Sequence, residues 1–210
     1  KKIKDVNGRL EFIRKFKNNI RVFIDYAHTP DALFKTIKSL KQDFGNNISI
    51  VFGCGGDRDK KKRPLMAKIA NDNCKKIYVT DDNPRNENPN KIRSHLLKYI
   101  SQTKVFNIGK RELAIKKAIQ NAKPNELILV AGKGHEEKQI YKDKIYNISD
   151  KKIIKRINFK HKVISIKKQN YFQNNQILKK IINISKSVNF KGLSVDTRTL
   201  KKENLFLAIK

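Results

Sequence analysis

Four short segments of the chain combine glycine or proline with acidic, basic and amide side chains, the residue types that bind polar ligands. They are Asp25-Tyr26-Ala27-His28-Thr29-Pro30, Gly53-Cys54-Gly55-Gly56-Asp57-Arg58-Asp59, Asp81-Asp82-Asn83-Pro84-Arg85 and Gly132-Lys133-Gly134-His135-Glu136. An arginine in such a segment can grip a carboxylate through paired N–H donors, and a glutamate can hold an ammonium group. Each segment follows an apolar run, so the four together are candidates for one composite site.

The elements that would position these segments are visible in the hydrophobic pattern. From residue 20 to 158, short apolar runs alternate with stretches that carry apolar residues at helical spacing, which is typical of a parallel sheet covered by helices. The predicted strands are 21–24, 48–52, 76–79, 104–108 and 126–131. Ligands of an open parallel sheet bind beyond the carboxyl ends of its strands, so we expect all four segments on one rim.

The chain beyond the last of these strands predicts a closing hairpin and then a change of organisation. Runs at 139–141 and 144–148 are separated by Lys142-Asp143 and read as the hairpin, with a final helix starting near Ser149. We therefore predict one domain over residues 1–158, a Lys/Asn/Gln-rich linker over 159–175, and the start of a second, truncated α/β domain over 176–210. In that last part we expect a short helix at 176–185 and strands around 193–195 and 205–209.

The first two segments also have purely structural interpretations. Asp25 could form a turn at a strand end, and His28 could cap the helix that follows. The glycines of 53–56 could make a tight turn, with Arg58 and the basic run 60–63 lying on a solvated face.

The same holds for the other two segments. Residues 82–84 could be only a turn, because Asp-Asn and Asn-Pro favour turns. Residues 132–136 look like a phosphate loop, but the full GxxxxGK[ST] pattern is absent from the chain, which excludes a complete nucleoside triphosphatase of that class. A shared rim for four such loops favours a composite site over four unrelated turns.

Composition limits the remaining classes of function. The formal charge is +30, but only ten of the 49 basic residues are arginine and the lysines are spread along the chain, so we do not expect nucleic-acid binding as the main function. Two cysteines cannot form a disulfide framework and fit a reducing cytoplasm. No apolar run approaches the ~20 residues that span a bilayer, so no membrane insertion is expected.

The ordered motifs resemble a known family. Gly8-Arg9-Leu10-Glu11, DYAHTPDAL, FGCGGDRDKKKRPLM, TDDNPR and LVAGKGHE, in this order and at this spacing, resemble the UDP-N-acetylmuramoyl-tripeptide synthetase group of Mur ligases. The resemblance implies a Rossmann-like open, mostly parallel sheet of about six strands with helices on both faces. It also implies that this segment is the third domain of a longer ATP-dependent ligase and catalyses nothing alone.

The resemblance implies a reaction and a nucleotide site. In such enzymes ATP, with Mg²⁺ held mainly by domains outside this segment, phosphorylates the terminal carboxylate of UDP-MurNAc-L-Ala-D-Glu, and the incoming amino acid attacks the acyl phosphate. By resemblance, Arg9 would reach the ATP phosphates when the domains close. Asp25 would accept hydrogen bonds from the ribose, and His28 would lie beside the nucleotide.

The amino-acid pocket implied by the resemblance suits meso-diaminopimelate, which carries two ammonium and two carboxylate groups. Arg58 and Arg85 would each grip a carboxylate, and Glu136 with the carbonyl of Gly132 would hold an ammonium group. Asp82, Asn83 and Pro84 would shape the loop and bind the ligand. Lysine lacks the distal carboxylate, and an unmatched polar group costs ~1–3 kcal/mol, so we predict selectivity for diaminopimelate of ten-fold to several-hundred-fold.

Residues 192–208 carry a shorter resemblance. Gly192-Leu193-Ser194-Val195-Asp196-Thr197-Arg198 followed by Asn204-Leu205-Phe206-Leu207-Ala208 resembles the start of the UDP-binding domain of another Mur ligase. The ligase that adds D-Ala-D-Ala next would fit this position, which would make the chain the junction of a fusion of two consecutive enzymes. Val195 and Thr197 would then contact the uridine nucleotide, although an ordinary strand and turn would explain each residue singly.

Two other functions predict different features. A folylpolyglutamate or cyanophycin type of Mur-like ligase shares the fold, and the segments 82–85 and 132–136 argue against it. A basic nucleic-acid-binding module would interleave arginine and aromatic residues on one surface. The chain has no tryptophan, and part of its arginine lies in the motifs above.

Overall fold

A computed structural model of the chain describes residues 7–158, together with the backbone of residues 192–194 and 204–206. The chain divides into two compact units, Lys1–Phe159 and Lys160–Lys210. The first unit holds nearly all the described residues.

The first unit is built on a six-stranded sheet with the strand order β1-β2-β6-β3-β4-β5. The strands are β1 (Glu11–Lys15), β2 (Arg21–Asp25), β3 (Ile48–Phe52), β4 (Lys76–Val79), β5 (Val105–Asn107) and β6 (Leu127–Ala131). All neighbouring pairs are parallel except β1 with β2, which is antiparallel. This confirms the predicted α/β class and the mostly parallel sheet.

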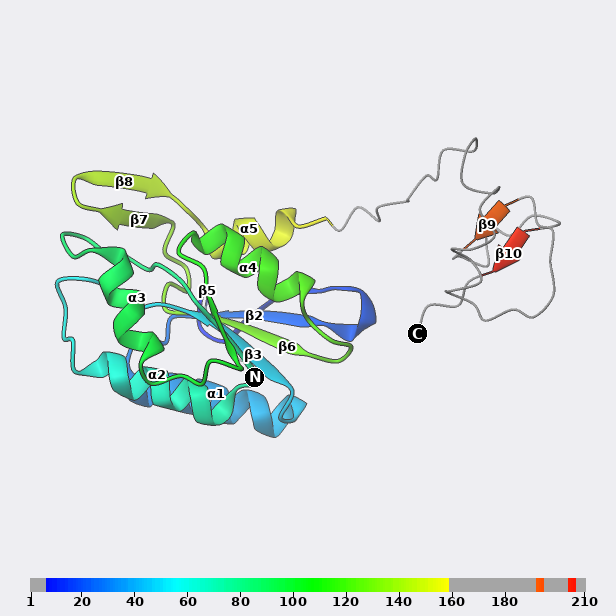
Figure 1. Ribbon diagram of the computed structural model, residues 1–210, viewed down its shortest axis with the longest axis horizontal. Helices are drawn as coiled ribbons and strands as arrows, with labels where there is room; N and C mark the ends of the chain where they lie inside the picture. The colour runs from blue at the N-terminus through cyan, green and yellow to red at the C-terminus, as the bar shows by residue number, and fades with distance from the viewer. Residues whose placement is uncertain (1–6, 159–191, 195–203, 207–210) are drawn as a thin grey trace, which may run out of the picture. The chain divides into compact units, whose positions relative to one another are not determined.

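Helices cover both faces of this sheet (Figure 1). One face packs against α1 (Pro30–Phe44), α2 (Lys62–Asn73) and α3 (Pro89–Leu97), and the other against α4 (Arg111–Gln120) and α5 (Asp150–Arg156). Side chains alternate across a strand, so within β3 Ile50 enters the first core and Val51 the second. All five residues of β3 are buried, as expected for a central parallel strand covered on both faces.

Local signals set the ends of the helices. Thr29, not His28, caps α1, because its side chain accepts a hydrogen bond from the amide of Ala32. The alternative that His28 acts as a helix cap is therefore wrong. Ser149 caps α5 in the same way, as predicted from the sequence.

The hairpin predicted after the sheet is present as β7 (Lys138–Tyr141) and β8 (Lys144–Asn147). It is joined to the loop after β4: the Arg85 amide donates to the Ile140 carbonyl over 3.0 Å, and the Lys142 amide donates to the Arg85 carbonyl over 2.8 Å. The hairpin therefore fixes the backbone on both sides of Arg85. No described helix is both long and apolar enough to cross a membrane.

In the second unit the described backbone consists of β9 (Gly192–Ser194) and β10 (Asn204–Phe206), which pair in parallel. Strands were predicted around both positions. The helix predicted at 176–185 and the candidate uridine contacts Val195 and Thr197 lie outside the described residues.

Candidate active site

The four polar segments follow β2, β3, β4 and β6, and the sheet brings them to one edge, as predicted. These strands are parallel, so their carboxyl ends share one rim. Close backbone packing shows the convergence directly. A Cβ atom added to Gly53 would lie 2.1 Å from the Thr80 carbonyl oxygen, and one added to Gly132 would lie 2.8 Å from Asp82 Oδ2.

The glycine-rich segment after β3 is more than a tight turn, because it packs against the segment after β4. The Gly56 amide donates to the Asn83 carbonyl over 2.9 Å. A Cβ atom on Gly56 would lie 1.9 Å from the Pro84 carbonyl oxygen, a distance that no side chain tolerates. The absence of a side chain at Gly56 thus lets the loops that carry Arg58 and Arg85 touch.

The two arginines predicted to bind carboxylates both lie beside Gly55. The Cβ position of Gly55 is 2.9 Å from Arg85 Nη1 and 3.8 Å from Arg58 Cγ. Arg85 Nη1 also donates to the carbonyl oxygens of Gly56 (2.9 Å) and Asn83 (3.3 Å). Arg85 is half-buried and Arg58 exposed, so one guanidinium is held by the loops and the other can reach a ligand from solvent.

A buried ion pair locks these two loops together. Arg63 is only 3% exposed, and it binds the Glu87 carboxylate through Nη1 (3.1 Å) and Nη2 (2.9 Å) and the Gly55 carbonyl through Nη2 (3.2 Å). Its hydrogen bonds lower the pKa of Glu87. The interpretation of the basic run 60–63 as a solvated face is therefore wrong for Arg63, which the sequence did not single out.

The segment Asp82-Asn83-Pro84 is buried and so is not a simple surface turn. Asn83 Oδ1 accepts from the Ile140 amide over 3.0 Å, and Asn83 Nδ2 donates to Glu136 Oε2 over 3.2 Å. The Asp82 side chain is 8% exposed and lies against the Cα of Gly132. Within residues 7–158, no hydrogen bond or salt bridge reaches the Asp82 carboxylate, although the charge of the buried Arg111 acts on it from a distance. Its oxygens are therefore available to hydrogen-bond a ligand.

Lys133 lies at the junction of the segments after β4 and β6. Its side chain is fully buried, and Nζ lies 3.2 Å from Glu136 Oε2 and 3.5 Å from Asn83 Oδ1 and also donates to the Lys138 carbonyl. Glu136 keeps 35% of its side chain exposed. Sequence reasoning missed Lys133 because a lysine in a loop is ordinarily solvated, and only its place at the end of a buried strand hinted otherwise.

A second cluster occupies the β2 side of the rim, where a nucleotide was expected. The Arg9 guanidinium lies 4.7 Å from the centre of the Tyr26 ring, and that ring lies 4.6 Å from the His28 ring and 5.7 Å from the His135 ring. The exposed side chains of Arg9 and His28 therefore share one partner. Tyr26 and His135 belong to segments that the sequence identified, but neither was selected as a site residue.

Asp25 is buried beneath this cluster and is held by protein donors. Its carboxylate accepts from the amides of Leu10 (2.6 Å) and Ala27 (2.7 Å) and from the Thr36 hydroxyl (3.1 Å). Asp25 thus forms the strand-end turn weighed as its structural alternative, and it also fixes the loop that carries Arg9. Its predicted contact with a ribose stays a prediction.

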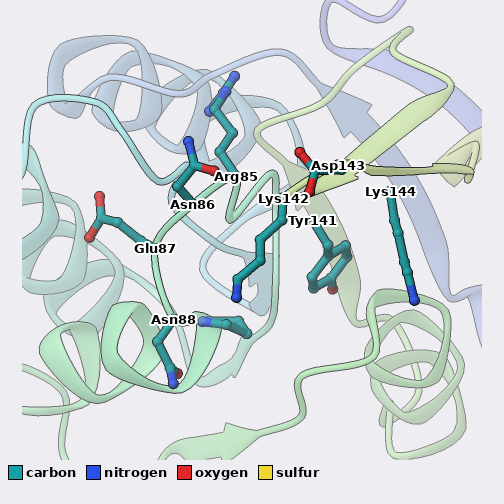
Figure 2. Close-up of a pocket in the computed structure, with 9 residues that line it drawn as sticks. Arg85, Asn86, Glu87, Asn88, Tyr141, Lys142, Asp143 and Lys144 are labelled. Atoms are coloured by element: carbon teal, nitrogen blue, oxygen red, sulfur yellow. The ribbon is translucent and has the colours of Figure 1, made fainter.

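A hollow of about 480 Å³ lies beside Arg85, between the segment 86–89 and the tip of the hairpin. Figure 2 shows the Arg85 side chain directed away from Asn88 and Lys142, so this hollow is not the predicted amino-acid pocket. Arg85 is the one predicted site residue among those that line it. Among the described residues, no group of three or more His, Cys, Asp or Glu side chains is arranged to hold a metal ion.

The chain is similar to known proteins in both sequence and fold. Residues 8–134 match the family described as "Mur ligase, glutamate ligase domain". The chain is 45% identical over 156 residues to a "UDP-N-acetylmuramoyl-L-alanyl-D-glutamate--2,6-diaminopimelate ligase" of Rickettsia montanensis, covering 73% of this chain and 32% of that protein. A protein with the same description from Buchnera aphidicola subsp. Acyrthosiphon pisum is 46% identical over 154 residues, covering 73% and 31% respectively.

A solved structure with that description superposes with a TM-score of 0.66 and 36% identity, covering 73% of this chain and 32% of the other. The chain thus spans about a third of the length of the relatives it matches. Through residues 8–134, which include the polar segments after β2, β3 and β4 and the start of the one after β6, the chain belongs to the Mur ligase family.

Proposed function

We propose that the chain forms the acceptor amino-acid domain of an ATP-dependent ligase that adds meso-diaminopimelate to UDP-MurNAc-L-Ala-D-Glu. One observation carries the proposal: two arginines flank Gly55 on the same rim on which the Asp82 and Glu136 carboxylates lie. Cations and anions that gather on one rim match an amino acid with two zwitterionic ends. The descriptions of the Rickettsia and Buchnera relatives name this reaction for those proteins.

In this proposal each end of the amino acid meets groups of opposite charge. Arg85 and Arg58 bind carboxylate through paired N–H donors, a geometry that lysine does not offer. Glu136, Asp82 and the Gly132 carbonyl accept hydrogen bonds from an ammonium group. Asn83 and Pro84 set the shape of the loop, Asn83 through its contact with Glu136 and Pro84 through its packing on Gly56.

The nucleotide side of the site is assigned to the cluster at the end of β2. ATP supplies the phosphoryl group that activates the acceptor carboxylate. Arg9 contributes a fixed positive charge toward the phosphates, where a guanidinium offsets developing negative charge. Asp25 and His28 lie at the ribose and beside the nucleotide, and Mg²⁺ is held by parts of the whole protein outside the described residues.

The discriminating test is ligation by the complete enzyme with meso-diaminopimelate or L-lysine as acceptor. Replacing Arg85 with alanine leaves one carboxylate of diaminopimelate without its partner, and loss of a charged hydrogen bond of this kind costs ~1.5–3 kcal/mol. We expect the KM for diaminopimelate to rise about ten-fold to 150-fold. Arg156→Ala removes an exposed guanidinium at the far end of α5 and serves as the control. An unchanged KM in Arg85→Ala would remove the assignment.

We also propose that residues 176–210 begin the UDP-binding domain of a fused ligase that adds D-Ala-D-Ala. The motif at 192–198 and the parallel pairing of β9 with β10 support this. The test is an assay of the full-length protein for ATP-dependent addition of D-Ala-D-Ala to the tripeptide product. A full-length protein that makes the tripeptide but never extends it would refute the fusion.

A further inference from the structure

We infer that Lys133 is a positioning residue for the acceptor amino acid, whose buried ammonium holds Glu136 and Asn83 in the geometry that receives the substrate ammonium group. The inference rests on the proposed function, because it assigns the exposed part of Glu136 to that ligand. No relative's description assigns a role to this lysine.

The contacts of Lys133 are directed inward, away from solvent. The side chain is fully buried, and its Nζ has three acceptors: Glu136 Oε2 at 3.2 Å, Asn83 Oδ1 at 3.5 Å and the Lys138 carbonyl. An ammonium group has three donors, so these contacts account for all of them. Lys133 therefore touches the binding groups from behind and does not face the ligand.

Glu136 receives both of its protein donors on the same oxygen. Lys133 Nζ and Asn83 Nδ2 each lie 3.2 Å from Oε2. No hydrogen bond from the described residues reaches the other oxygen, and 35% of the side chain is exposed. Two donors on one oxygen fix the rotation of the carboxylate, and the second oxygen stays free for a ligand.

The position of Lys133 also connects three parts of the rim. Asn83 belongs to the loop after β4, Glu136 to the loop after β6, and Lys138 to the start of the hairpin. A buried charge is costly unless it is paired and hydrogen-bonded, so this lysine favours only arrangements in which all three acceptors surround it. The three donors of an ammonium group point in tetrahedral directions, whereas the donors of arginine lie in one plane.

The experiment compares variants of the complete ligase in steady-state kinetics. Lys133→Met keeps the length of the side chain and removes its charge and donors. We expect the KM for diaminopimelate to rise ten-fold or more, while the KM for ATP stays within two-fold of the wild type. Lys138→Met is the matched control, because the Lys138 side chain is exposed and only its carbonyl contacts Lys133.

A double variant separates positioning from general packing. If Lys133 acts through Glu136, combining Lys133→Met with Glu136→Gln raises the KM for diaminopimelate about as much as the stronger single variant does. The inference would be overturned if the two changes in the KM for diaminopimelate multiply in the double variant. It would also be overturned if Lys133→Met changes this KM two-fold or less while Glu136→Gln changes it ten-fold. An unchanged KM in Glu136→Gln would instead refute the proposed pocket itself.

Lys133→Gln covers the case in which the methionine variant does not fold, as judged by thermal melting. The glutamine amide still offers N–H donors toward Glu136 but carries no positive charge. We therefore expect a KM for diaminopimelate at least three-fold above that of the wild type. A wild-type KM in a folded Lys133→Gln variant would overturn the inference.

Discussion

The side chains of Arg111 and Asp150 form an ion pair and are both completely buried. The pair connects α5 to the site. Asp150 Oδ1 accepts from Arg111 Nε over 2.8 Å, and Oδ2 accepts from Nη2 over 2.7 Å. Arg111 Nη2 also donates to the Ala131 carbonyl over 3.0 Å, directly before Gly132. The pair therefore holds α5 against the strand that carries the segment 132–136.

We predict that Asp150→Ala destabilises the chain by about 3–5 kcal/mol, because it leaves a buried guanidinium without its counter-charge. Burial alone lowers the pKa of Arg111, but the charge and hydrogen bonds of Asp150 outweigh it and raise the pKa above its ordinary value. Neither group is exposed, so solvent does not screen the pair. In a unit of this size, each kcal/mol of lost stability lowers the melting midpoint by about 2–4 °C. The midpoint of Asp150→Ala should therefore fall by roughly 6–20 °C.

The free energy of unfolding is measured by urea denaturation monitored by circular dichroism, with two comparison variants. Asp31→Ala removes an exposed acid from the first turn of α1 together with its exposed ion pair to Lys35, so it gives an upper limit for the helix-terminus contribution, which is below about 1 kcal/mol. Arg111→Met combined with Asp150→Leu replaces the pair by apolar groups and should be more stable than either single variant. A loss below 1 kcal/mol in Asp150→Ala, or a double variant as unstable as the sum of the singles, would refute the reasoning.

Two further predictions concern the loops of the site. Gly56→Ala should destabilise the chain more than Gly55→Ala in thermal melts, because the added methyl group at Gly56 meets the backbone carbonyl of Pro84 and the one at Gly55 meets the end of a flexible side chain. Arg63 lowers the pKa of Glu87, so this pair stabilises the fold above the ordinary glutamate pKa and the contribution is lost as the pH falls through the lowered value. The wild type should therefore lose more stability than Glu87→Gln between pH 5 and pH 3 in urea titrations, and equal losses would contradict it.

Hydrophobic pattern was sufficient to predict the central strands, because β3 and β6 are buried on both faces and read as continuous apolar runs. It did not reveal β1, an edge strand in which no residue is buried and the pairing is irregular between Phe12 and Arg14. It also left α2 undefined, since small residues such as Ala67 and Ala70 make up much of its buried face and give little contrast in hydropathy.

The convergence of the four polar segments on one rim could be predicted, but the partners of their side chains could not. Parallel topology alone puts the ends of neighbouring strands on one rim, and short motifs mark those ends. Arg63 and Lys133 are among the residues that this reasoning missed, and both are buried cations. Lysine and arginine are almost never buried unless paired. Arg63 pairs with an acceptor 24 residues away, and Lys133 reaches Asn83 across 50 residues, separations that no local pattern spans. The other two acceptors of Lys133 lie within five residues of it.

The glycines couple the two halves of the rim through backbone contact. A Cβ atom on Gly134 would lie 2.5 Å from the Gly8 carbonyl oxygen, and one on Gly8 would lie 2.3 Å from the His135 amide nitrogen. The loop that carries Arg9 therefore rests directly on the loop that carries Glu136. A displacement of the backbone at Arg9 must either break this packing or move the loop of Glu136 with it. The backbone segments that carry the residues assigned to the phosphates and to the acceptor amino acid are therefore mechanically linked.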